Sequence, residues 1–322
     1  MSLVLGSTAC SGGPEALTIY SGRDEALVGP LLERFAEESR ISIDVRYGDS
    51  AELALLIEEE GDASPADVYF SQSPGAVEYL SEKDRLAPLD ESLLGKVEEG
   101  FQGQSGDWVG VTARSRVIVY NEDLVDPDDL PESVLDLPGS EFASSVGLAP
   151  SNGSFQDFVT AMRQTEGDEV ALEWLSDLAA SGAPTFPDNN SIVDAVARGE
   201  IPLGLVNHYY NLRFLDEDPS LPSRNAAFIA GDIGNLLIAS PLAILKTSDQ
   251  SEEAADLIEF LLNDESMRFF AEETFEYPLA KGAEPSDELE PLDALPAPQF
   301  DIQSLGGGLQ GTVMLIEQSG LL

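Results

Sequence analysis

Apolar and polar positions near the start of the chain alternate in a strand, helix, strand order. Residues 16–21 form a short β-type run that ends in a Ser-Gly turn. Apolar positions then recur at the spacing of one helix face: Leu27, Pro30, Leu31, Leu32 and Phe35. Residues 41–48 alternate again with the period of a strand. This order predicts a right-handed parallel β-α-β unit.

The same alternation continues through most of the chain. Further helices are predicted at 51–60, 74–84, 155–165, 169–182, 191–200, 251–264 and 266–275, and further strands at 66–71, 145–150 and 202–207. Two longer β-regions, 107–121 and 236–245, flank the middle block. The chain of 322 residues exceeds the ~250–300 residues at which a single core stops growing. The pattern therefore predicts a two-lobed α/β protein whose chain crosses between lobes at least twice.

The charge balance of the chain is strongly acidic. Sixty Asp and Glu residues stand against sixteen Lys and Arg residues, which gives a formal net charge of −44. A surface of this kind repels nucleic acid and anionic lipid, so we expect neither as a partner. The acidic residues are spread along the chain rather than collected in a tail, which is typical of a folded protein adapted to high salt. Acidity alone predicts no specific metal site.

Cysteine and histidine are almost absent. One Cys excludes an internal disulfide framework, and one His argues against His-based catalysis or a His-rich metal site. Cys10 follows a short apolar stub in MSLVLGSTACSGGPE. Residues 1–15 are either the end of a secretory signal with a cysteine for lipid attachment or a flexible tail with a chance cysteine. No later run approaches the ~20 apolar residues of a membrane span.

The sequence does not predict an enzyme. It contains no convincing nucleophile and base pair, no G-x-S-x-G, no P-loop and no dinucleotide fingerprint. Carboxylate pairs are too numerous in this chain to indicate a catalytic dyad. The predicted class is therefore a binding protein.

Polar and aromatic residues gather where three predicted strands end. These segments are 21-SGRDE-25, 71-SQS-73 and 207-NHYY-210. Ligands of open α/β sheets bind at the carboxyl ends of strands. Adjacent residues on a strand point to opposite faces, so Tyr209 and Tyr210 can share one ligand only where the backbone leaves the strand. Taken alone, the pair is more typical of ordinary strand-end tyrosines than of a ligand site.

Several stretches together resemble a known family. The matching stretches are 17-LTIYSGR-23, 46-RYGDSAEL-53, 60-EGDASPADVYFSQ-72, 108-WVGVTARSRVIVYN-121, 147-GLAPSNGSFQDFVTAM-162, 198-RGEIPLGLVNHYY-210 and 276-EYPL-279. They resemble the ferric-ion-binding proteins of bacterial ABC importers, the transferrin-like members of the type 2 periplasmic solute-binding proteins. The resemblance implies Fe(III) as cargo, with Tyr209 and Tyr210 as its ligands.

The resemblance also implies an architecture, a partner and a location. It predicts a two-lobed α/β fold of the type 2 periplasmic-binding-protein class, with a hinge and a central ligand cleft. Together with the two long β-regions, it predicts an N-terminal lobe of residues 16–113 plus 239–287 and a C-terminal lobe of 114–238 plus 288–322. We expect a monomer that delivers its cargo to an importer permease. The expected location is the periplasm or the outer face of the cell membrane, with Cys10 as the candidate lipid anchor.

The chemistry of the tyrosine pair agrees with this cargo. A ferric ion is small and triply charged, and it prefers hard anionic oxygen donors such as phenolate. A free Tyr keeps its proton to about pH 10, but a bound multivalent cation favours the ionised form. Iron binding should therefore release protons and weaken in acid. His208 is expected to be structural.

A Ser-Asn-Gly-Ser turn at 151–154 opens a predicted helix and offers free backbone N–H groups. The resemblance implies that Asn152, Gly153 and Ser154 bind the carbonate, bicarbonate or phosphate that completes the iron shell. Asn189 and Asn207 match supporting positions of that family. Without the resemblance, a plain helix cap is the favoured interpretation of Asn152, Gly153 and Ser154, and Asn189 and Asn207 could equally be caps or turn residues. Asp188 stands where a basic residue is common in the family.

Three arginines stand out in a chain so poor in cations. Arg23 and Arg116 are predicted to clamp an oxyanion, because a guanidinium binds such groups through two parallel hydrogen bonds. Arg114 is predicted to form a structural ion pair with one of the many carboxylates.

The first lobe departs from the family pattern at two positions. Asp24 stands where many members have His, and Gln72 stands where many have Glu. A ferric ion with two phenolates keeps one positive charge, which neutral Gln72 cannot cancel. Either Asp24 is a ligand or an exogenous anion supplies the balance; we favour the anion, with Gln72 as a weak oxygen ligand or a donor to it. Asp24 is then expected to cap the following helix.

The alternative function uses the same two-lobed fold for another solute. An oxyanion, a polyamine or a sugar would each suit such a cleft. A visible tyrosinate–ferric absorption separates these options, because none of the other solutes gives a coloured protein.

Overall fold

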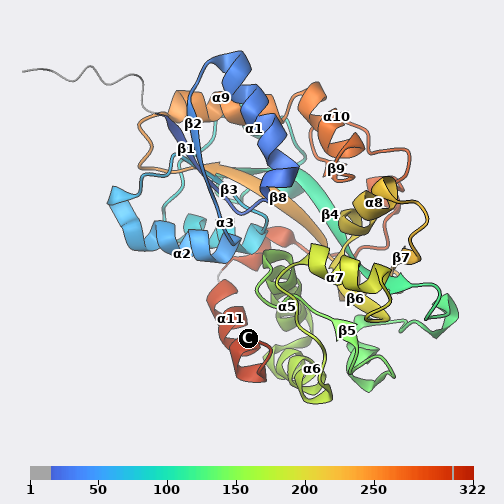
Figure 1. Ribbon diagram of the computed structural model, residues 1–322. Helices are drawn as coiled ribbons and strands as arrows, with labels where there is room; N and C mark the ends of the chain where they lie inside the picture. Colours follow the sequence, from blue (N-terminus) through green and yellow to red (C-terminus); the bar gives the residue numbers. More distant parts are fainter. Residues whose placement is uncertain (1–15, 307) are drawn as a thin grey trace, which may run out of the picture.

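The computed structural model describes residues 16–306 and 308–322. The predicted N-terminal tail at 1–15, with Cys10, lies outside the described residues. A mixed sheet runs through the molecule in the order β2-β1-β3-β8-β4-β6-β5, and β7 and β9 also pair with β4 (Figure 1). The strands are β1 Leu17–Ser21, β2 Ile43–Tyr47, β3 Val68–Phe70, β4 Trp108–Asn121, β5 Val146–Gly147, β6 Leu203–Asn207, β7 Ser223–Ala226, β8 Leu237–Ile244 and β9 Tyr277–Pro278.

Helices cover the sheet and supply most of the remaining core. They are α1 Glu25–Ser39, α2 Ser50–Glu60, α3 Pro74–Glu82, α4 Glu91–Leu94, α5 Gly153–Glu166, α6 Asp168–Ser181, α7 Asn189–Ala197, α8 His208–Glu217, α9 Ser251–Leu261, α10 Asp264–Glu272 and α11 Leu309–Ser319. Short 3₁₀ helices join them. None of the helices in the described ranges is both long enough and apolar enough to span a bilayer.

The first part of the chain forms the predicted parallel unit. β1 pairs in parallel with both β2 and β3, with α1 and α9 on one side and α2 and α3 on the other (Figure 1). Leu27, Leu31 and Phe35 are buried, as their spacing predicts. Pro30 is exposed inside α1, so the prediction that it belongs to the buried face is wrong. The buried stripe consists of the Leu, Val and Phe side chains around it.

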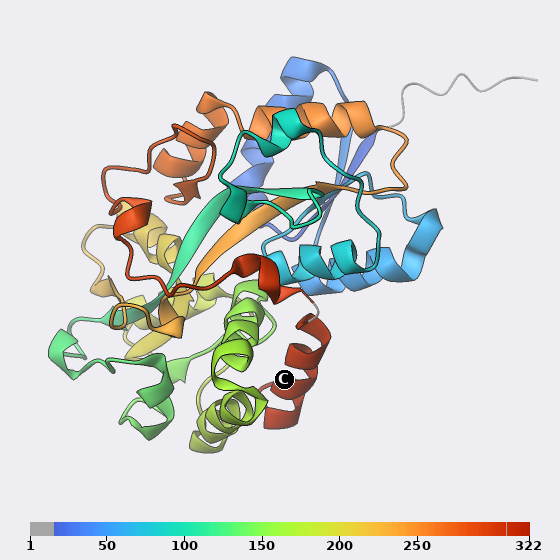
Figure 2. The ribbon, with the colours of Figure 1, turned by 180° about the vertical axis from the view of Figure 1, so that it is seen from behind.

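The long strand β4 changes partners half-way along. Residues 108–115 pair antiparallel with β8, whereas 116–120 pair antiparallel with β6 and 118–121 with β7. Every residue of β4 is buried. Seen from behind, β4 and β8 run diagonally between the two parts of the molecule (Figure 2). The two predicted long β-regions are therefore the strands that join these parts.

Five helices and strands were not predicted from the pattern: α4, α8, β7, β9 and α11. The last of these, α11, lies beside α5 and α6 at the end of the chain (Figure 2). The most important is α8, which begins directly after β6 at His208. Tyr209 and Tyr210 consequently lie in the first turn of a helix rather than at the frayed end of a strand.

Candidate functional site

The side chains of Tyr209 and Tyr210 are buried and lie side by side. They are 0% and 2% exposed, and their rings stack with centroids 4.2 Å apart and planes inclined by 29°. Successive side chains of a helix are separated by about 100° rather than the 180° of a strand. The start of α8 at His208 therefore allows both phenols to face one point.

Gln72 meets this pair from the loop between β3 and α3. Its Nε2 donates to the Tyr210 hydroxyl at 3.2 Å, and its backbone N–H donates to Ser50 Oγ at 2.9 Å. The Tyr209 hydroxyl is buried and has no hydrogen-bond partner in the described part of the chain. The structure thus brings Gln72 to the tyrosines and leaves one phenol oxygen for another contact.

Burial keeps both phenols protonated in the absence of a cation. It raises the pKa of Tyr209 to about 12, although the nearby Arg23 charge opposes the shift. Burial also raises the pKa of Tyr210 well above its usual value, and the charges of Tyr209 and Asp24 add to the effect. A multivalent cation at these oxygens would supply the charge needed to expel the protons.

Asp24 lies just before α1, near enough to the tyrosine pair for its charge to act on both phenols. It occupies the cap position of α1, but its side chain accepts no capping hydrogen bond, so the predicted capping role is wrong. The residue is exposed, yet partial desolvation of its carboxyl raises its pKa, with Arg23 opposing and Asp188 adding to the shift. Its charge is close enough to raise the pKa of both phenols.

Arg23 is buried and its two terminal nitrogens are engaged. Nη1 donates to Ser240 Oγ at 2.8 Å, and Nη2 donates to the buried Glu276 carboxylate at 2.5 Å. Its Nε alone is without a partner within residues 16–306 and 308–322. Burial lowers the pKa of this guanidinium, but the negative charges of Glu276, Tyr209 and Tyr210 together outweigh that effect and raise it. An anion would reach Arg23 through Nε rather than through its fork.

Arg114 does not form the predicted ion pair. It is fully buried, and its Nε and Nη2 both donate to Ser154 Oγ at 3.3 Å. Its Nη1 donates to Ser240 Oγ, and no carboxylate pairs with it in the part of the chain that the structure describes. Burial lowers its pKa, and the charge of Arg23 lowers it further. Arg23, which follows β1, and Arg114, which lies on β4, both donate to the hydroxyl of Ser240 on β8.

Arg116 keeps one nitrogen unpaired. Its Nη1 donates to Asn207 Oδ1 at 3.3 Å, while its buried Nη2 has no partner among the residues described. The guanidinium lies 6.0 Å and 5.8 Å from the ring centroids of Phe155 and Phe158. Burial and the charge of Arg114 lower its pKa to about 9.

The predicted anion turn opens α5. Asn152 caps this helix, with its Oδ1 accepting from the Ser154 N–H at 3.1 Å. Ser154 Oγ accepts from Arg114 and from Asn207 Nδ2, the latter at 3.2 Å. Gly153 lies so close to the start of α3 that an added Cβ would be 3.2 Å from Ser73 Cβ. The structure therefore brings Asn152, Ser154, Asn207 and Arg116 into one hydrogen-bonded group.

Asn189 is the first residue of α7. It is fully buried, and both polar atoms of its side chain lack a partner within the described ranges. Asp188 caps α7 instead, accepting from the Ser191 N–H at 2.7 Å. Asp188 therefore has a local structural role at this helix start.

Sequence reasoning missed Glu276, Ser240, Asp157 and Asn211. Asp157 on α5 is buried, and its Oδ1 accepts from Ser73 Oγ at 2.6 Å and from the Gly75 N–H at 3.2 Å, both at the start of α3. Burial raises its pKa to about 7. Asn211 is buried, with both side-chain polar atoms unpaired in the described part of the chain. Glu276 and Asp157 lie in stretches that the family resemblance singled out, whereas Ser240 and Asn211 do not.

The buried charges at this site are mostly positive in a chain that is otherwise acidic. Arg23, Arg114 and Arg116 face two buried carboxylates, Glu276 and Asp157. Within the described residues, no group of three or more His, Cys, Asp or Glu side chains is arranged to hold a metal ion. The donors available to a cation are the two phenols with Asp24 and Gln72 nearby, which suits a hard, highly charged ion.

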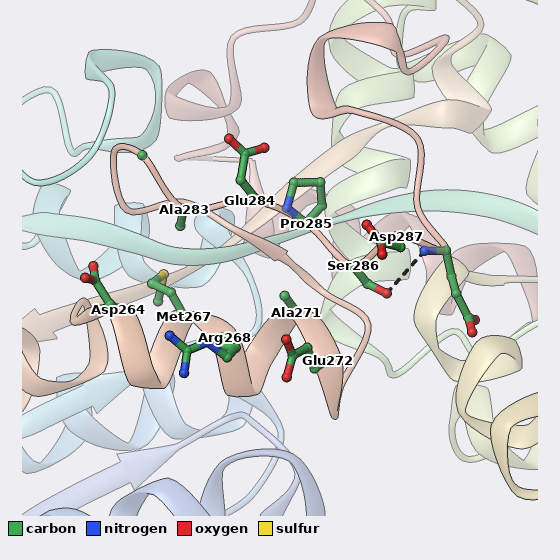
Figure 3. Close-up of a pocket in the computed structure, with 12 residues that line it drawn as sticks. Asp264, Met267, Arg268, Ala271, Glu272, Ala283, Glu284, Pro285, Ser286 and Asp287 are labelled. Carbon is green, nitrogen blue, oxygen red and sulfur yellow. Dashed lines mark hydrogen bonds between the residues drawn. The ribbon is translucent and has the colours of Figure 1, made fainter.

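A surface pocket of about 550 Å³ lies elsewhere, between α10 and the loop 282–288 (Figure 3). Acidic side chains dominate its lining, among them Asp264, Glu272, Glu284 and Asp287. None of the predicted site residues lines it. A loosely acidic surface pocket offers no defined set of metal ligands, so the buried tyrosine region is the better candidate.

Comparison with known proteins places the chain in a family. The family model described as bacterial extracellular solute-binding protein matches residues 63–302. The chain belongs to this family. The major ferric iron-binding protein of Neisseria meningitidis is 31% identical to this solute-binding protein over 98% of this chain and 96% of the relative. The Fe(3+)-binding periplasmic protein of Serratia marcescens is 29% identical over 100% of this chain and 95% of the relative.

A solved structure gives the same result for the fold. The iron-bound HitA of Pseudomonas aeruginosa superposes on this solute-binding protein with a TM-score of 0.90 and 33% identity, covering 95% of this chain and 100% of that one. The predicted two-lobed α/β fold is confirmed. The relatives named are binding proteins rather than enzymes, as the sequence predicts.

Proposed function

We propose that this solute-binding protein binds ferric iron between its lobes and delivers it to an ABC importer. The observation that carries the proposal is the stacked, buried pair of Tyr209 and Tyr210, with Gln72 hydrogen-bonded to one phenol. The names of the relatives, which are ferric-binding proteins, support the choice of metal. Periplasmic relatives also support delivery from that compartment.

The two phenols supply the anionic ligands in this proposal. Each loses its proton when iron binds, because the charge of the metal outweighs the effect of burial on the phenol pKa. Asp24 lies at the edge of the site with a carboxylate that can approach the metal. Gln72 supplies either its amide oxygen to the metal or its N–H to the accompanying anion.

A small anion completes the shell. A ferric ion with two phenolates carries one remaining positive charge, and the unpaired Nη2 of Arg116 adds a donor for an oxyanion. Asn152, Gly153 and Ser154 at the start of α5 offer the positive end of a helix, and Asn189, Asn207 and the Nε of Arg23 complete the proposed anion site. Carbonate, bicarbonate and phosphate all have the required charge and size.

Closure of two lobes over the ligand is part of the proposal. Residues 16–113 plus 239–287 form one lobe and 114–238 plus 288–322 the other, so that β4 and β8 provide the hinge. Tyr209 and Tyr210 then belong to one lobe, and Asp24 and Gln72 to the other. A monomer of this kind would present both lobes to its permease. Small-angle scattering that gives the same radius of gyration with and without iron would contradict closure.

The visible spectrum after adding ferric citrate with bicarbonate tests the function. We expect a broad tyrosinate-to-iron absorption in the wild-type protein and in Tyr120→Phe, which removes a buried phenol on β4 far along the strand from the site. A protein that stays colourless and retains an oxyanion, polyamine or sugar in native mass spectrometry would favour the alternative solute function.

Cys10 is the proposed site of a lipid anchor. The proposal rests on the small residues that precede this cysteine in the sequence. Expression of the full chain in a bacterial host should place it in the detergent phase on partition, and Cys10→Ser should move it to the aqueous phase. Equal partition of both proteins would contradict the anchor.

A further inference from the structure

We propose that Phe275 and Glu276 form a positioning element that couples the two halves of the iron site. The Phe275 carbonyl holds His208 beside Tyr209, and the Glu276 carboxylate holds Arg23 beside Asp24. The inference rests on the proposed ferric site. It assigns a role to two adjacent residues between α10 and β9 that bind neither the metal nor the anion.

The first arm runs from Phe275 to the tyrosines. His208 Nε2 lies 2.8 Å from the Phe275 carbonyl oxygen, and His208 Nδ1 lies 3.2 Å from the Ser115 backbone nitrogen. A backbone N–H can only donate, so Nδ1 accepts and the proton is on Nε2, which donates to the carbonyl. Both ring nitrogens are thereby fixed. His208 is the first residue of α8, so these bonds hold the turn that carries both phenols.

Packing around His208 extends this restraint to Tyr209. The imidazole is buried, and its ring lies edge-on to that of Tyr209, with centroids 5.8 Å apart and an angle of 86°. On its other side it packs against Tyr277, with centroids 5.1 Å apart. A movement of the Phe275 carbonyl would therefore be transmitted to the first phenol through a rigid ring.

The second arm runs from Glu276 to the other half of the site. The fully buried carboxylate accepts from Arg23 Nη2 at 2.5 Å, from Thr112 Oγ1 at 3.0 Å and from Thr274 Oγ1 at 3.2 Å. Arg23 directly precedes Asp24 in the loop after β1. Glu276 therefore fixes the guanidinium and, through it, the loop that brings the Asp24 carboxylate to the tyrosines.

The backbone between the two arms is specialised. Phe275 has φ of 55°, a left-handed conformation that is costly for a residue with a side chain. Such outliers persist where surrounding contacts hold them. Here the conformation directs the carbonyl toward His208 while the next residue directs its carboxylate toward Arg23. The following strand, β9, pairs with residues 112 and 113 of β4, so the element is attached to the strand that joins the two parts of the sheet.

A double-mutant cycle on iron release tests the coupling. The variants are His208→Phe, which keeps a ring of similar shape without its nitrogens, and Glu276→Gln, which keeps the shape and removes the charge. Iron release to excess EDTA is followed through the loss of the tyrosinate absorption. Each single change should speed release by about tenfold, the effect typical of losing a group that orients a metal ligand.

The double variant decides between coupling and separate structural roles. Coupled arms predict release only about 10–20-fold faster than wild type, whereas independent effects would multiply to about 100-fold. The control pair is His208→Phe with Glu78→Gln. Glu78 is a buried carboxylate away from the site, and it accepts from Trp108 Nε1 at 2.7 Å. Its effect on the release rate should multiply with that of His208→Phe. Effects that multiply in the first pair, or wild-type release in both singles, would overturn the inference.

Two further measurements keep the outcome interpretable. Glu276→Asp retains the charge but shortens the arm, so it should show the same coupling to His208→Phe if Glu276→Gln does not fold. Thermal unfolding of the iron-free variants shows whether each one is folded before its release rate is compared. A wild-type protein without tyrosinate absorption would refute the proposed function itself, whereas normal absorption with multiplying release rates would refute only the coupling.

Discussion

The stacked rings of Tyr209 and Tyr210 have their centroids 4.2 Å apart at the start of α8. The start of α8 at His208 makes this arrangement possible, because two successive strand residues would point their phenols to opposite faces of the sheet. Gln72 bonds to Tyr210, while the Tyr209 hydroxyl has no partner in the described chain. The pair therefore presents two oxygens of different surroundings to one ligand.

Removing either phenol oxygen should abolish tight ferric binding. We expect Tyr209→Phe and Tyr210→Phe to weaken it by more than about 100-fold, since loss of groups that merely orient a ligand already costs 10–100-fold. Tyr209→Phe should hardly change stability because its hydroxyl is unpaired, and Tyr210→Phe should cost about 1 kcal/mol for the Gln72 bond. Competition with citrate and thermal unfolding measure the two quantities. Full affinity in both variants would show that the tyrosines are not ligands.

A ferric ion with two phenolates keeps one positive charge, and either an anion or Asp24 can balance it. These two possibilities lead to opposite predictions. If the anion completes the shell, stripping bicarbonate and phosphate from the buffer abolishes tight binding, and Asp24→Asn reduces it only modestly. We expect this result because Arg116 keeps a buried nitrogen that has no partner among the described residues. Titration in anion-free buffer makes the comparison. Tight binding there that disappears in Asp24→Asn would assign the ligand to the carboxylate.

Iron binding should strengthen as pH rises through the neutral range. Burial raises the pKa of Tyr209 to about 12 and that of Tyr210 well above its ordinary value. Both phenols are therefore protonated before iron binds, and binding must release their protons, so acid opposes it. The logarithm of the apparent affinity should rise by about two for each pH unit, one for each displaced proton. An affinity independent of pH would contradict phenolate ligation.

The raised phenol pKa values also affect the iron-free protein at high pH. An unfolded Tyr titrates near pH 10, below the folded values. The stability that the buried neutral phenols contribute is full below the unfolded pKa and falls as pH rises toward the folded one. The free energy of unfolding, measured with denaturant, should fall less above pH 10 in the Tyr209→Phe variant than in the wild type.

Asp157 should make the iron-free protein less stable as pH rises from about 4 to about 7. Burial raises its pKa to about 7, against about 3.9 in an unfolded chain. Its contribution is complete below the unfolded pKa and is lost between about pH 4 and 7, with an upper bound of about 4 kcal/mol. Asp157→Asn should remove that dependence while keeping an oxygen for Ser73 and Gly75. Urea unfolding at pH 5 and pH 8 measures it, with the exposed Glu166→Gln as control; equal pH slopes in wild type and Asp157→Asn would contradict the assignment.

Much of the fold follows from local pattern. The period of apolar positions predicted β1, α1, β2 and the two long strands, because in these segments burial of one face or of both faces decides the structure. The pattern failed at Pro30, which lies exposed in α1, and at α8. A strand followed by two aromatic residues has no local signal for a helix start, since Tyr suits either structure.

The sequence by itself determined the acidic composition, the strand ends at which the site forms and the adjacent tyrosines. The tertiary structure decided which groups surround them. Arg23 and Glu276 are separated by 253 positions, and Ser73 and Asp157 by 84. Arg114 has serine partners rather than the predicted carboxylate. Contacts of this kind depend on how all the elements pack, and because a buried side chain bonds to whatever packing brings within reach, no local pattern specifies its partner.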